Sequence, residues 1–523
     1  MGNIGGLRPR LLSNARERPR RLLRRLFRRA PGALPPDFLF GTATSDHQCE
    51  AYDPRYPDVW DVWEQAHPPG REGVTPYTAR GRATDFWTRW PEDVELARQL
   101  GCRAFRISIA WSRVEPAPGA FSDEALAHYR ALVDGIVAAG MEPVVTLMHF
   151  VWPVHVEARG GLRAAAFPDW FGRYARQVRD ALGDRVRYWI TINEPNAFIF
   201  GYFKPVWMPE FFWPPGLPPD SRPGDMMRAT AEVIRNLFLA NRAARLELRA
   251  GRGGERRLVA ANGYYLGLPN RLWRLPIPLM RWVDAHARRE QGWSEEDWVI
   301  REGRLVDRPS PPAAPRLLEP PFGLFGPGVG PLGRAIDALG AFATIFSFGA
   351  SNWWHLGMEG DLPTFLCPEE CRGQQDYVAF DYYFGTSHLL NVANLMHVLE
   401  RRYGHAPVWA DGFYDALKYL QGMFPTQPIF VIENGVAGPL NSTRKTRYLR
   451  EHVQAVQRAH RDGINVIGYL AWSLTTNREW GLPEGPGSDF GLYSIDLDND
   501  PSLTRSMTSA AAQYAALIRH RGA

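Results

Sequence analysis

Strand-like segments alternate with segments of helical periodicity through most of the 523-residue chain. This alternation predicts an α/β fold, a (β/α)8 TIM barrel. The chain exceeds the roughly 250 residues of a minimal barrel, but the fold tolerates long loops within one domain. Two strand-like segments that end in glutamates also fit a barrel, because its functional groups lie at the carboxyl ends of the strands. We therefore expect a single domain with long active-site loops and a basic N-terminal tail.

The basic character of the chain belongs to its N-terminus. The first 30 residues contain ten Arg and one Glu, a net charge of +9, so the rest of the chain carries −4 of the total of +5. We expect residues 1–36 to be a tail, either disordered or an amphipathic helix on an anionic membrane surface. Residues 37–523 should form the catalytic barrel domain. Within it, residues 203–375 or so form a divergent insertion, because their alternation of strand-like and helical segments is less regular than in the rest of the domain. The charge balance gives the barrel no nucleic-acid partner.

The secondary-structure elements follow from hydrophobic period and from turn residues. The expected strands, the first with its loop, are 38–45, 104–111, 142–148, 186–192, 257–262, 376–382, 428–432 and 465–472. The expected helices are 85–101, 125–139, 167–182, 229–249, 414–424 and 446–462. Residues 270–360 show no clean period, so we expect loops on the face formed by the carboxyl ends of the strands, where sequence variation is greatest.

Two glutamates close strand-like segments. The run from Tyr188 to Ile192 is β-branched and aromatic, and Pro195 must end it because proline cannot donate a ladder hydrogen bond. Glu194 therefore lies at a strand end. Glu433 follows a similar apolar run and precedes an Asn-Gly turn. Glycoside hydrolysis needs such a pair, with one carboxyl as the acid and the other as nucleophile or base. A strand-end glutamate alone is more often a solvated residue.

The segments around both glutamates resemble a known family. Thr191-Ile192-Asn193-Glu194-Pro195 and Ile432-Glu433-Asn434-Gly435 resemble the motif pair of the retaining β-glycosidases of glycoside hydrolase family 1. The resemblance extends from about Phe38 to the end. It implies a double displacement in which Glu194 is the acid/base and Glu433 the nucleophile, with carboxyl groups about 5–5.5 Å apart. It implies no metal and no organic cofactor.

The resemblance also implies side chains that support the nucleophile. Arg106 lies in a segment similar to the family's R-F/I-S-I-x-W, and Tyr383 matches a tyrosine that hydrogen-bonds the nucleophile. Arg106 would hold Glu433 ionised. Asp381 stands where the family usually has Asn. This carboxyl would either raise the pKa of a neighbouring acid or form an ion pair with an arginine.

Segments similar to the family's sugar-binding motifs supply the expected substrate contacts, which are Gln48, His149, Asn193, Trp472, Glu479, Trp480 and Phe490. Glu479 favours an unphosphorylated hexose, because an anion would repel phosphate. Glucose, galactose and fucose are equally compatible with this set. The chain departs from the family pattern at Phe150, Leu162, Asp381, Thr476, Arg478 and Asp489.

The expected activity is hydrolysis of a small-molecule β-glycoside in the manner of a β-glucosidase. The apolar insertion suggests a hydrophobic or lipid-like aglycone. A transglycosylase with a lipid or alcohol acceptor and a catalytically degenerate carbohydrate-binding protein remain open. An unrelated metal hydrolase is disfavoured, because no cluster has ligand spacing.

The remaining features bear on location. The four cysteines suggest no disulfide framework, and the C-x3-C at Cys367 and Cys371 indicates a surface loop with two thiols rather than a zinc site. We find no secretory signal and no convincing membrane-spanning segment. We expect a cytoplasmic protein with possible peripheral membrane contact through its tail, and the oligomeric state is open.

Overall fold

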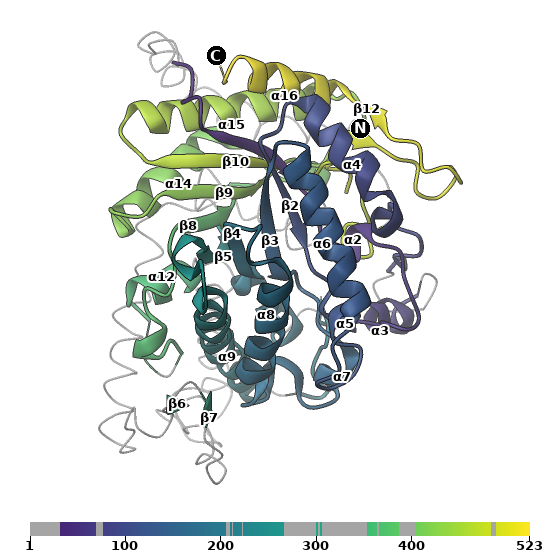
Figure 1. Cartoon of the computed structure of the whole chain (residues 1–523), viewed down its shortest axis with the longest axis vertical. Helices are drawn as coiled ribbons and strands as arrows, with labels where there is room; N and C mark the ends of the chain where they lie inside the picture. The colour runs from purple at the N-terminus through teal and green to yellow at the C-terminus, as the bar shows by residue number, and fades with distance from the viewer. Residues whose placement is uncertain are drawn as a thin grey trace, which may run out of the picture.

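The computed structural model describes residues 32–68, 77–204, 210–211, 213–221, 223–265, 300–301, 304–305, 353–362, 364, 366–385, 403–482 and 488–522. Within them, parallel strands form a closed eight-stranded barrel in the order β1-β10-β9-β8-β5-β4-β3-β2 (Figure 1). The strands are β1 (Leu39–Ala43), β2 (Ala104–Ser108), β3 (Glu142–Met148), β4 (Tyr188–Asn193), β5 (Leu258–Tyr264), β8 (Val378–Asp381), β9 (Ile429–Asn434) and β10 (Val466–Trp472). The predicted single-domain (β/α)8 barrel is confirmed.

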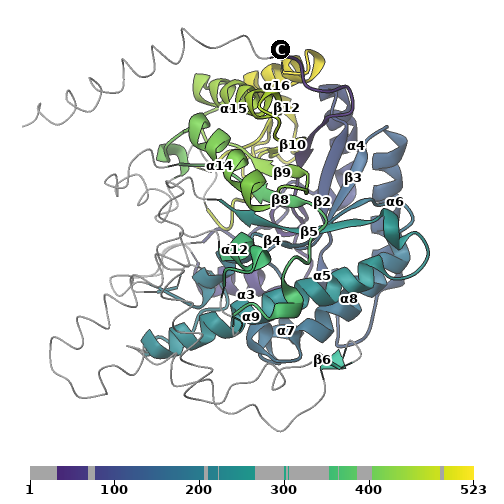
Figure 2. The same cartoon turned by 90° about the vertical axis from the view of Figure 1, so that its left-hand side faces the viewer.

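Helices surround the barrel. Figure 2 shows the strands between α14 and α15 on one side and α6 and α8 on the other. The helices are α2 (Asp46–Cys49), α3 (Val59–Ala66), α4 (Phe86–Leu100), α5 (Trp111–Val114), α6 (Asp123–Ala138), α7 (Val154–Glu157), α8 (Phe167–Leu182), α9 (Pro223–Arg249), α12 (Trp353–Glu359), α14 (Ala410–Met423), α15 (Thr443–Arg461) and α16 (Ser509–Arg519). Small antiparallel pairs join β6 (Ile300–Arg301) to β7 (Arg304–Leu305) and β11 (Tyr493–Ser494) to β12 (Ser506–Met507).

Helix α8 shows how the outer layer forms. Its apolar residues recur at intervals of three and four, so one face is apolar. Phe167, Phe171, Tyr174, Val178 and Leu182 are all buried on that face. The helix begins with a proline in its first turn, where the missing N–H would be unpaired anyway. The predicted bounds of α8 and β3 are those observed.

The barrel interior is a packed core. Parallel strands covered by helices are buried on both faces, which explains their continuous apolar runs. A cluster inside the barrel takes side chains from successive strands: Ala104, Val144, Tyr188, Ile190, Ala260, Tyr377, Ala379, Phe430, Ile432 and Leu470. This filled interior leaves the carboxyl ends of the strands as the place for a pocket.

The two ends of the described chain meet. β1 pairs with β10, from Leu39 opposite Gly468 to Ala43 opposite Trp472, and this pairing closes the barrel. Helix α16 packs beside α4, as Figure 1 shows. The N-terminal and C-terminal segments therefore complete the barrel sheet and its outer layer of helices together.

Several predicted bounds were wrong. β2 ends at Ser108 rather than at residue 111, because Trp111 begins α5 and stacks on Tyr174 at 4.9 Å between ring centroids. Helix α9 begins at Pro223 rather than at residue 229, since proline is compatible with a first turn. β8 is shorter than expected: before it, the Asp376 side chain accepts hydrogen bonds from Arg245 and from the Val259 amide.

Two expectations of surface or loop character were also wrong. Cys367 and Cys371 are buried free thiols, because their segment packs against α9. The end of the region expected to be loop forms α12, since Trp353 and Trp354 pack on Phe238 of α9. Residues 270–299, 302–303 and 306–352 of this region, and residues 1–31 of the tail, lie outside the described residues. In the described chain, no helix has both the length and the apolar character needed to cross a bilayer.

Candidate functional site

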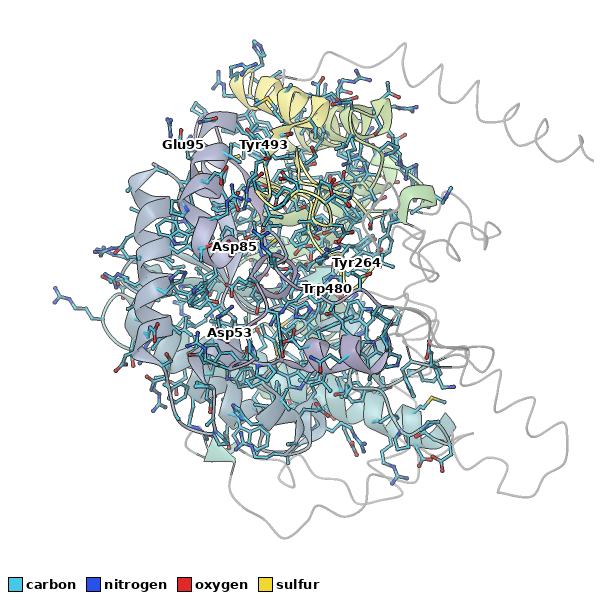
Figure 3. All side chains as sticks on the ribbon, turned by 90° about the vertical axis from the view of Figure 1, so that its right-hand side faces the viewer. Asp53, Asp85, Glu95, Tyr264, Trp480 and Tyr493 are labelled. Atoms are coloured by element: carbon cyan, nitrogen blue, oxygen red, sulfur yellow. The ribbon has the colours of Figure 1, made fainter. Side chains whose placement is uncertain are left out.

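A pocket lies at the carboxyl ends of the strands. Two of its wall residues, Tyr264 and Trp480, are labelled in Figure 3. The lining is largely aromatic, with three glutamates and one histidine among it: His149, Phe150, Glu194, Ala197, Phe200, Trp213, Tyr264, Tyr383, Phe384, Tyr403, Glu433, Trp472, Glu479, Trp480 and Phe490. The pocket therefore brings together the two strand-end glutamates that are 239 positions apart in the sequence.

Strand register sets the floor of the pocket. Asn193 at the end of β4 lies opposite Asn262 of β5. Tyr264 lies opposite Asp381, and Asp381 lies opposite Glu433 of β9. Because all these strands are parallel, their last residues converge at one end of the barrel. The register of the strands themselves therefore places the side chains of Asn193, Asn262, Asp381 and Glu433 side by side.

Glu433 is held by two donors. Arg106 of β2 and the Tyr383 hydroxyl each donate a hydrogen bond to one of its carboxylate oxygens. Arg106 is itself fixed, because Nε donates to Thr146 at 2.8 Å and Nη2 to Asn193 Oδ1 at 2.6 Å. The contacts that the resemblance implied for Arg106 and Tyr383 are present. This environment stabilises an anion at Glu433.

Glu194 has a different environment. It follows β4 with a φ of +37°, in the left-handed region, and Pro195 starts the 3-10 helix η2 (Pro195–Gly201). Such strained residues cluster at functional sites. Burial first, and then the charge of Glu433, raise the pKa of Glu194 well above its usual value, although a hydrogen bond with Asp381 lowers it. Glu194 is thus a carboxyl that favours the protonated state.

Polar residues expected to bind a sugar lie at one end of the pocket. Gln48 Nε2 donates to Glu479 Oε2 at 2.9 Å and to Asn477 Oδ1 at 3.2 Å. Gln48 and Asn193 are fully buried behind the pocket wall, whereas Glu479 lines it. The Nδ2 of Asn193 has no hydrogen-bond partner among the described residues. Of the expected sugar contacts, Gln48 and Asn193 are therefore not part of the pocket lining, and Asn193 Nδ2 is an unsatisfied donor behind it.

His149 lies between two tryptophans. Its ring stacks at centroid distances of 5.7 Å from Trp472 and 5.8 Å from Trp480. Burial and the nearby charge of Arg106 hold the pKa of His149 well below its usual value, so the ring is neutral. Its Nδ1 has no partner in the described part of the chain. Phe490 completes the opposite wall, 5.7 Å from the Tyr383 ring.

Two departures from the family pattern explain one another, and a third makes a separate ion pair. Asp489 stands where the family has Arg, and Thr476 where it has Asp. Asp489 accepts hydrogen bonds from the Thr476 hydroxyl at 3.0 Å and from Lys445 Nζ at 2.9 Å. An ion pair is thus kept at this place, with Asp489 as the anion and Lys445 as the cation. Arg478 donates to Asp498, which is outside the pocket lining, so its charge is directed away from the glycone end.

A buried charge network beneath Trp480 was not predicted from the sequence. His47 stacks on Trp480 at 5.8 Å between centroids, and its ring nitrogens bond to Asp58 at 2.9 Å and Glu64 at 3.2 Å. Burial lowers the pKa of His47, but the charges of Asp58 and Glu64 raise it, to about 10 overall. We call this the Trp480 network: His47, Asp58, Asp61, Glu64 and Arg80.

The sequence held a signal for this network. Asp58 caps α3 through a capping box with Asp61, and Glu64 follows three residues later, so one end and face of the helix is acidic. Arg80 binds these acidic side chains. Its Nη2 lies 2.8 Å from Asp61 Oδ2, and its backbone N–H donates a hydrogen bond to Glu64 at 3.0 Å. The distant arginine could not be found from helical spacing.

Among the residues that the structure describes, two groups have carboxylate or imidazole atoms within 4.8 Å of one another, close enough to hold a metal ion. They are His47, Asp61 and Glu64, and Glu194, Asp381 and Glu433. Both groups already contain protein cations and donors. Arg80 bonds Asp61 in the first, and Arg106 bonds Glu433 in the second. Their charge is therefore balanced in part by arginine.

Comparison with known proteins gives one family. Residues 30–247 and 389–523 match the family model described as Glycosyl hydrolase family 1. A 1,4-beta-D-glucan glucohydrolase of Thermotoga neapolitana is 25% identical over 511 residues, which cover 94% of this chain and 99% of that protein. The cytosolic beta-glucosidase of Homo sapiens is 27% identical over 538 residues, with coverage of 94% and 99%.

A solved structure gives the same architecture. The beta-glucosidase from Thermotoga maritima in complex with galacto-hydroximolactam aligns with a TM-score of 0.67 at 21% identity. The alignment covers 94% of this chain and 99% of that one. At 21% identity, this likeness shows that the two chains share the barrel fold.

Proposed function

Because the chain belongs to glycosyl hydrolase family 1, it is an O-glycosyl hydrolase of the β-glycosidase type, and we propose that it hydrolyses unphosphorylated β-hexosides with retention. The proposed residues are Glu194 as acid/base and Glu433 as nucleophile. The observation that supports this assignment is the contrast between two adjacent buried carboxyls. Glu433 has Arg106 and Tyr383 as donors, whereas the pKa of Glu194 is raised by burial and by Glu433. Such pairs divide acid and nucleophile roles.

In the first step, Glu433 attacks the anomeric carbon while the Glu194 proton moves to the glycosidic oxygen. The glycosidic bond breaks, and the aglycone leaves with that proton. In the second step, Glu194 takes a proton from water, whose oxygen displaces Glu433 from the same carbon. The closest carboxylate oxygens lie within 4.8 Å. This separation favours direct attack, because an inverting enzyme needs about 6.5–9.5 Å for a water.

Glu479 supports the choice of an unphosphorylated sugar. It lines the pocket and accepts a hydrogen bond from Gln48, so its carboxylate is fixed near the glycone end. A 6-phosphate there would meet a like charge. We expect β-glucosides, β-galactosides or β-fucosides to be turned over, and their 6-phosphorylated forms to be poor substrates.

A covalent trap tests the assignment. The protein is incubated with 2,4-dinitrophenyl 2-deoxy-2-fluoro-β-glucoside, digested and examined by mass spectrometry. The fluorine slows both steps and the good leaving group lets the first proceed, so the glycosyl-enzyme accumulates. We expect the label on the peptide that carries Glu433. Absence of label, together with no turnover of aryl glucosides, galactosides and fucosides, would favour a degenerate carbohydrate-binding protein instead.

The aromatic wall supports a second part of the proposal, an apolar aglycone. Besides its polar groups, the pocket is lined by aromatic rings, which include Phe150, Phe200, Trp213, Phe384 and Tyr403. Phe150 and Trp213 pack edge to face at 4.6 Å. Such a surface gains free energy from apolar contact and offers few hydrogen-bond partners to a second sugar. We therefore propose alkyl or aryl aglycones rather than oligosaccharides.

A series of alkyl β-glucosides tests this preference. Each buried methylene contributes up to about 0.8 kcal/mol, so kcat/KM should rise up to about 4-fold per methylene until the pocket is filled. A flat series, or a preference for cellobiose over octyl glucoside, would contradict the proposal. Product analysis in the presence of added octanol measures how far an alcohol competes with water. Dominant octyl glycoside formation would favour the transglycosylase alternative.

A further inference from the structure

Asp381 is a third acid beside the two glutamates, at a position where the family usually has Asn. It is the last residue of β8, it is fully buried, and it lies opposite Glu433 in the strand register. One carboxylate oxygen from each of Glu194, Asp381 and Glu433 lies within 4.8 Å of the others. A buried acid in this place must have its charge neutralised or shared.

The hydrogen bonds of Asp381 are incomplete. Oδ2 accepts a hydrogen bond from Asn262, which also donates to Asn193 Oδ1 at 2.7 Å. Oδ1 has no donor among the described residues. A carboxyl oxygen of Glu194 lies within 4.8 Å of one of Asp381, yet two ionised carboxylates can only accept hydrogen bonds. A proton between them would supply the missing donor.

The guanidinium of Arg106, which is the positive charge near these acids in the described chain, already donates hydrogen bonds to other side chains. Arg106 faces the cluster from β2, and its two terminal nitrogens donate to Glu433 and to Asn193. The other titratable groups that face these acids are Tyr264, Tyr383 and Glu479, none of which is cationic. Three ionised carboxylates beside one guanidinium would repel one another strongly, so one of the three acids takes up a proton.

We propose that Asp381 is a positioning residue that shares one proton with Glu194, so that the pair keeps this proton available to the leaving group up to a higher pH than Glu194 alone would. The inference rests on the proposed roles of Glu194 and Glu433. It assigns a function to a departure from the family pattern. Burial and the charge of Glu433 raise the pKa of both Asp381 and Glu194, which is consistent with one proton held between them.

The sharing also balances charge through both steps. Before reaction, Glu433 and the proton-sharing pair each carry one negative charge. After the first step, Glu433 is a neutral ester, and the proton has left with the aglycone, so Glu194 and Asp381 are both anionic. The total charge near Arg106 is unchanged. Glu194 beside the Asp381 anion is then a stronger base toward water than it would be beside an amide.

Asp381→Asn tests the inference, because it restores the amide of the family. In the wild type, the alkaline limb of the kcat/KM profile reports loss of the shared proton. In the variant, that limb should move to lower pH by about one unit or more, since the neighbouring negative charge is gone. The kcat for dinitrophenyl glycosides should also fall, because their first step needs little acid help and the second needs the base.

Asp376→Asn is the matched control, since it makes the same change at the opposite end of the same strand segment. Asp376 bonds Arg245 at 2.7 Å, away from the pocket. Its pH profile should keep the wild-type alkaline limb. The shape of a profile does not depend on how much enzyme is folded, and Asp381→Ala repeats the test without any side-chain carbonyl.

An alkaline limb that stays within about 0.2 pH units of the wild type in both Asp381 variants would overturn the inference. The covalent trap keeps this result separate from the proposed function. A label on Glu433 with an unmoved limb would reject only the role of Asp381. Absence of label in active wild-type protein would reject the assignment of the nucleophile itself.

Discussion

Two buried charge clusters lie near the pocket, one in contact with Trp480 through His47 and one at the strand ends, and they differ in how completely they are neutralised. The Trp480 network has three carboxyls beside two cations, Arg80 and His47 with its raised pKa. The pocket cluster has three carboxyls beside Arg106. Since unpaired buried charge destabilises a fold, the first cluster suits a structural role and the second a chemical one.

Hydrogen bonding shows the same difference. In the Trp480 network, Asp58 accepts from His47, and from the amides of Trp60 and Asp61 as an N-cap. In the pocket cluster, Asp381 Oδ1 and Asn193 Nδ2 lack partners within the described chain. In the Trp480 network each carboxyl has donors, although Arg80 Nε lacks a partner among the described residues. Carboxyls held by donors keep a surface in place, whereas an unsatisfied carboxyl oxygen beside reactive groups is open to a proton or a ligand.

The largest expected effect comes from the same substitution in each cluster. Glu433→Gln should reduce turnover of 4-nitrophenyl glycosides by about 10⁴-fold or more, because the amide cannot attack. Glu64→Gln should leave the chemistry in place and lower the free energy of unfolding by about 1–3 kcal/mol, since it weakens a buried hydrogen bond to His47. Steady-state kinetics and urea unfolding measure both. If folded Glu64→Gln lost as much turnover as Glu433→Gln, the division into a structural and a chemical cluster would be wrong.

A smaller effect should follow from removal of the structural cation. Arg80→Met leaves Asp58 and Asp61 with less compensation, so the free energy of unfolding should fall by about 3–5 kcal/mol. Arg98→Met is the matched control, because Arg98 pairs with Glu95 on the exposed side of α4 at 2.6 Å. That variant should change stability by less than about 0.5 kcal/mol. Equal losses in the two variants would contradict a special role for the network.

The stability of the network should depend on alkaline pH. The pKa of His47 is raised in the fold from 6.5 to about 10. A raised pKa stabilises the fold below the unfolded-state value, and this contribution disappears as pH rises through the folded-state value. The wild-type free energy of unfolding should therefore fall between about pH 6.5 and 10, by up to about 5 kcal/mol.

His47→Gln isolates that contribution. Without the titrating ring, the difference in unfolding free energy between variant and wild type should shrink as pH rises toward 10. Urea unfolding at several pH values measures it. A difference that stays constant with pH would show that His47 is not charged in the fold.

The smallest effect is expected at Arg478, which the sequence left ambiguous. Its guanidinium bonds Asp498 rather than facing the pocket. Arg478→Ala should change kcat/KM for an unphosphorylated β-glucoside less than about 3-fold, the size of an ordinary peripheral ion pair. A large gain or loss with 6-phosphorylated substrates, measured in parallel, would place Arg478 in the glycone site after all.

The sequence by itself determined the barrel and its functional rim. Strand composition, helical period and proline or Asn-Gly stops are local, so they were sufficient to place Glu194 and Glu433 at strand ends. The segment motifs of the family also led to Arg106 and Tyr383. The bounds of β2, β8 and α9 were missed because the limits of these elements depend on packing and capping partners elsewhere.

Only the tertiary structure decided which buried charges meet. Asp381 could be read as a tuning group or as an ion-pair partner, and strand register put it beside Glu194 and Glu433, with Arg106 already bonded to Glu433 and Asn193. The Trp480 network and the burial of Cys367 and Cys371 also depended on distant elements. A side chain's partners across a closed barrel are set by register and by chain closure, which local sequence patterns do not encode.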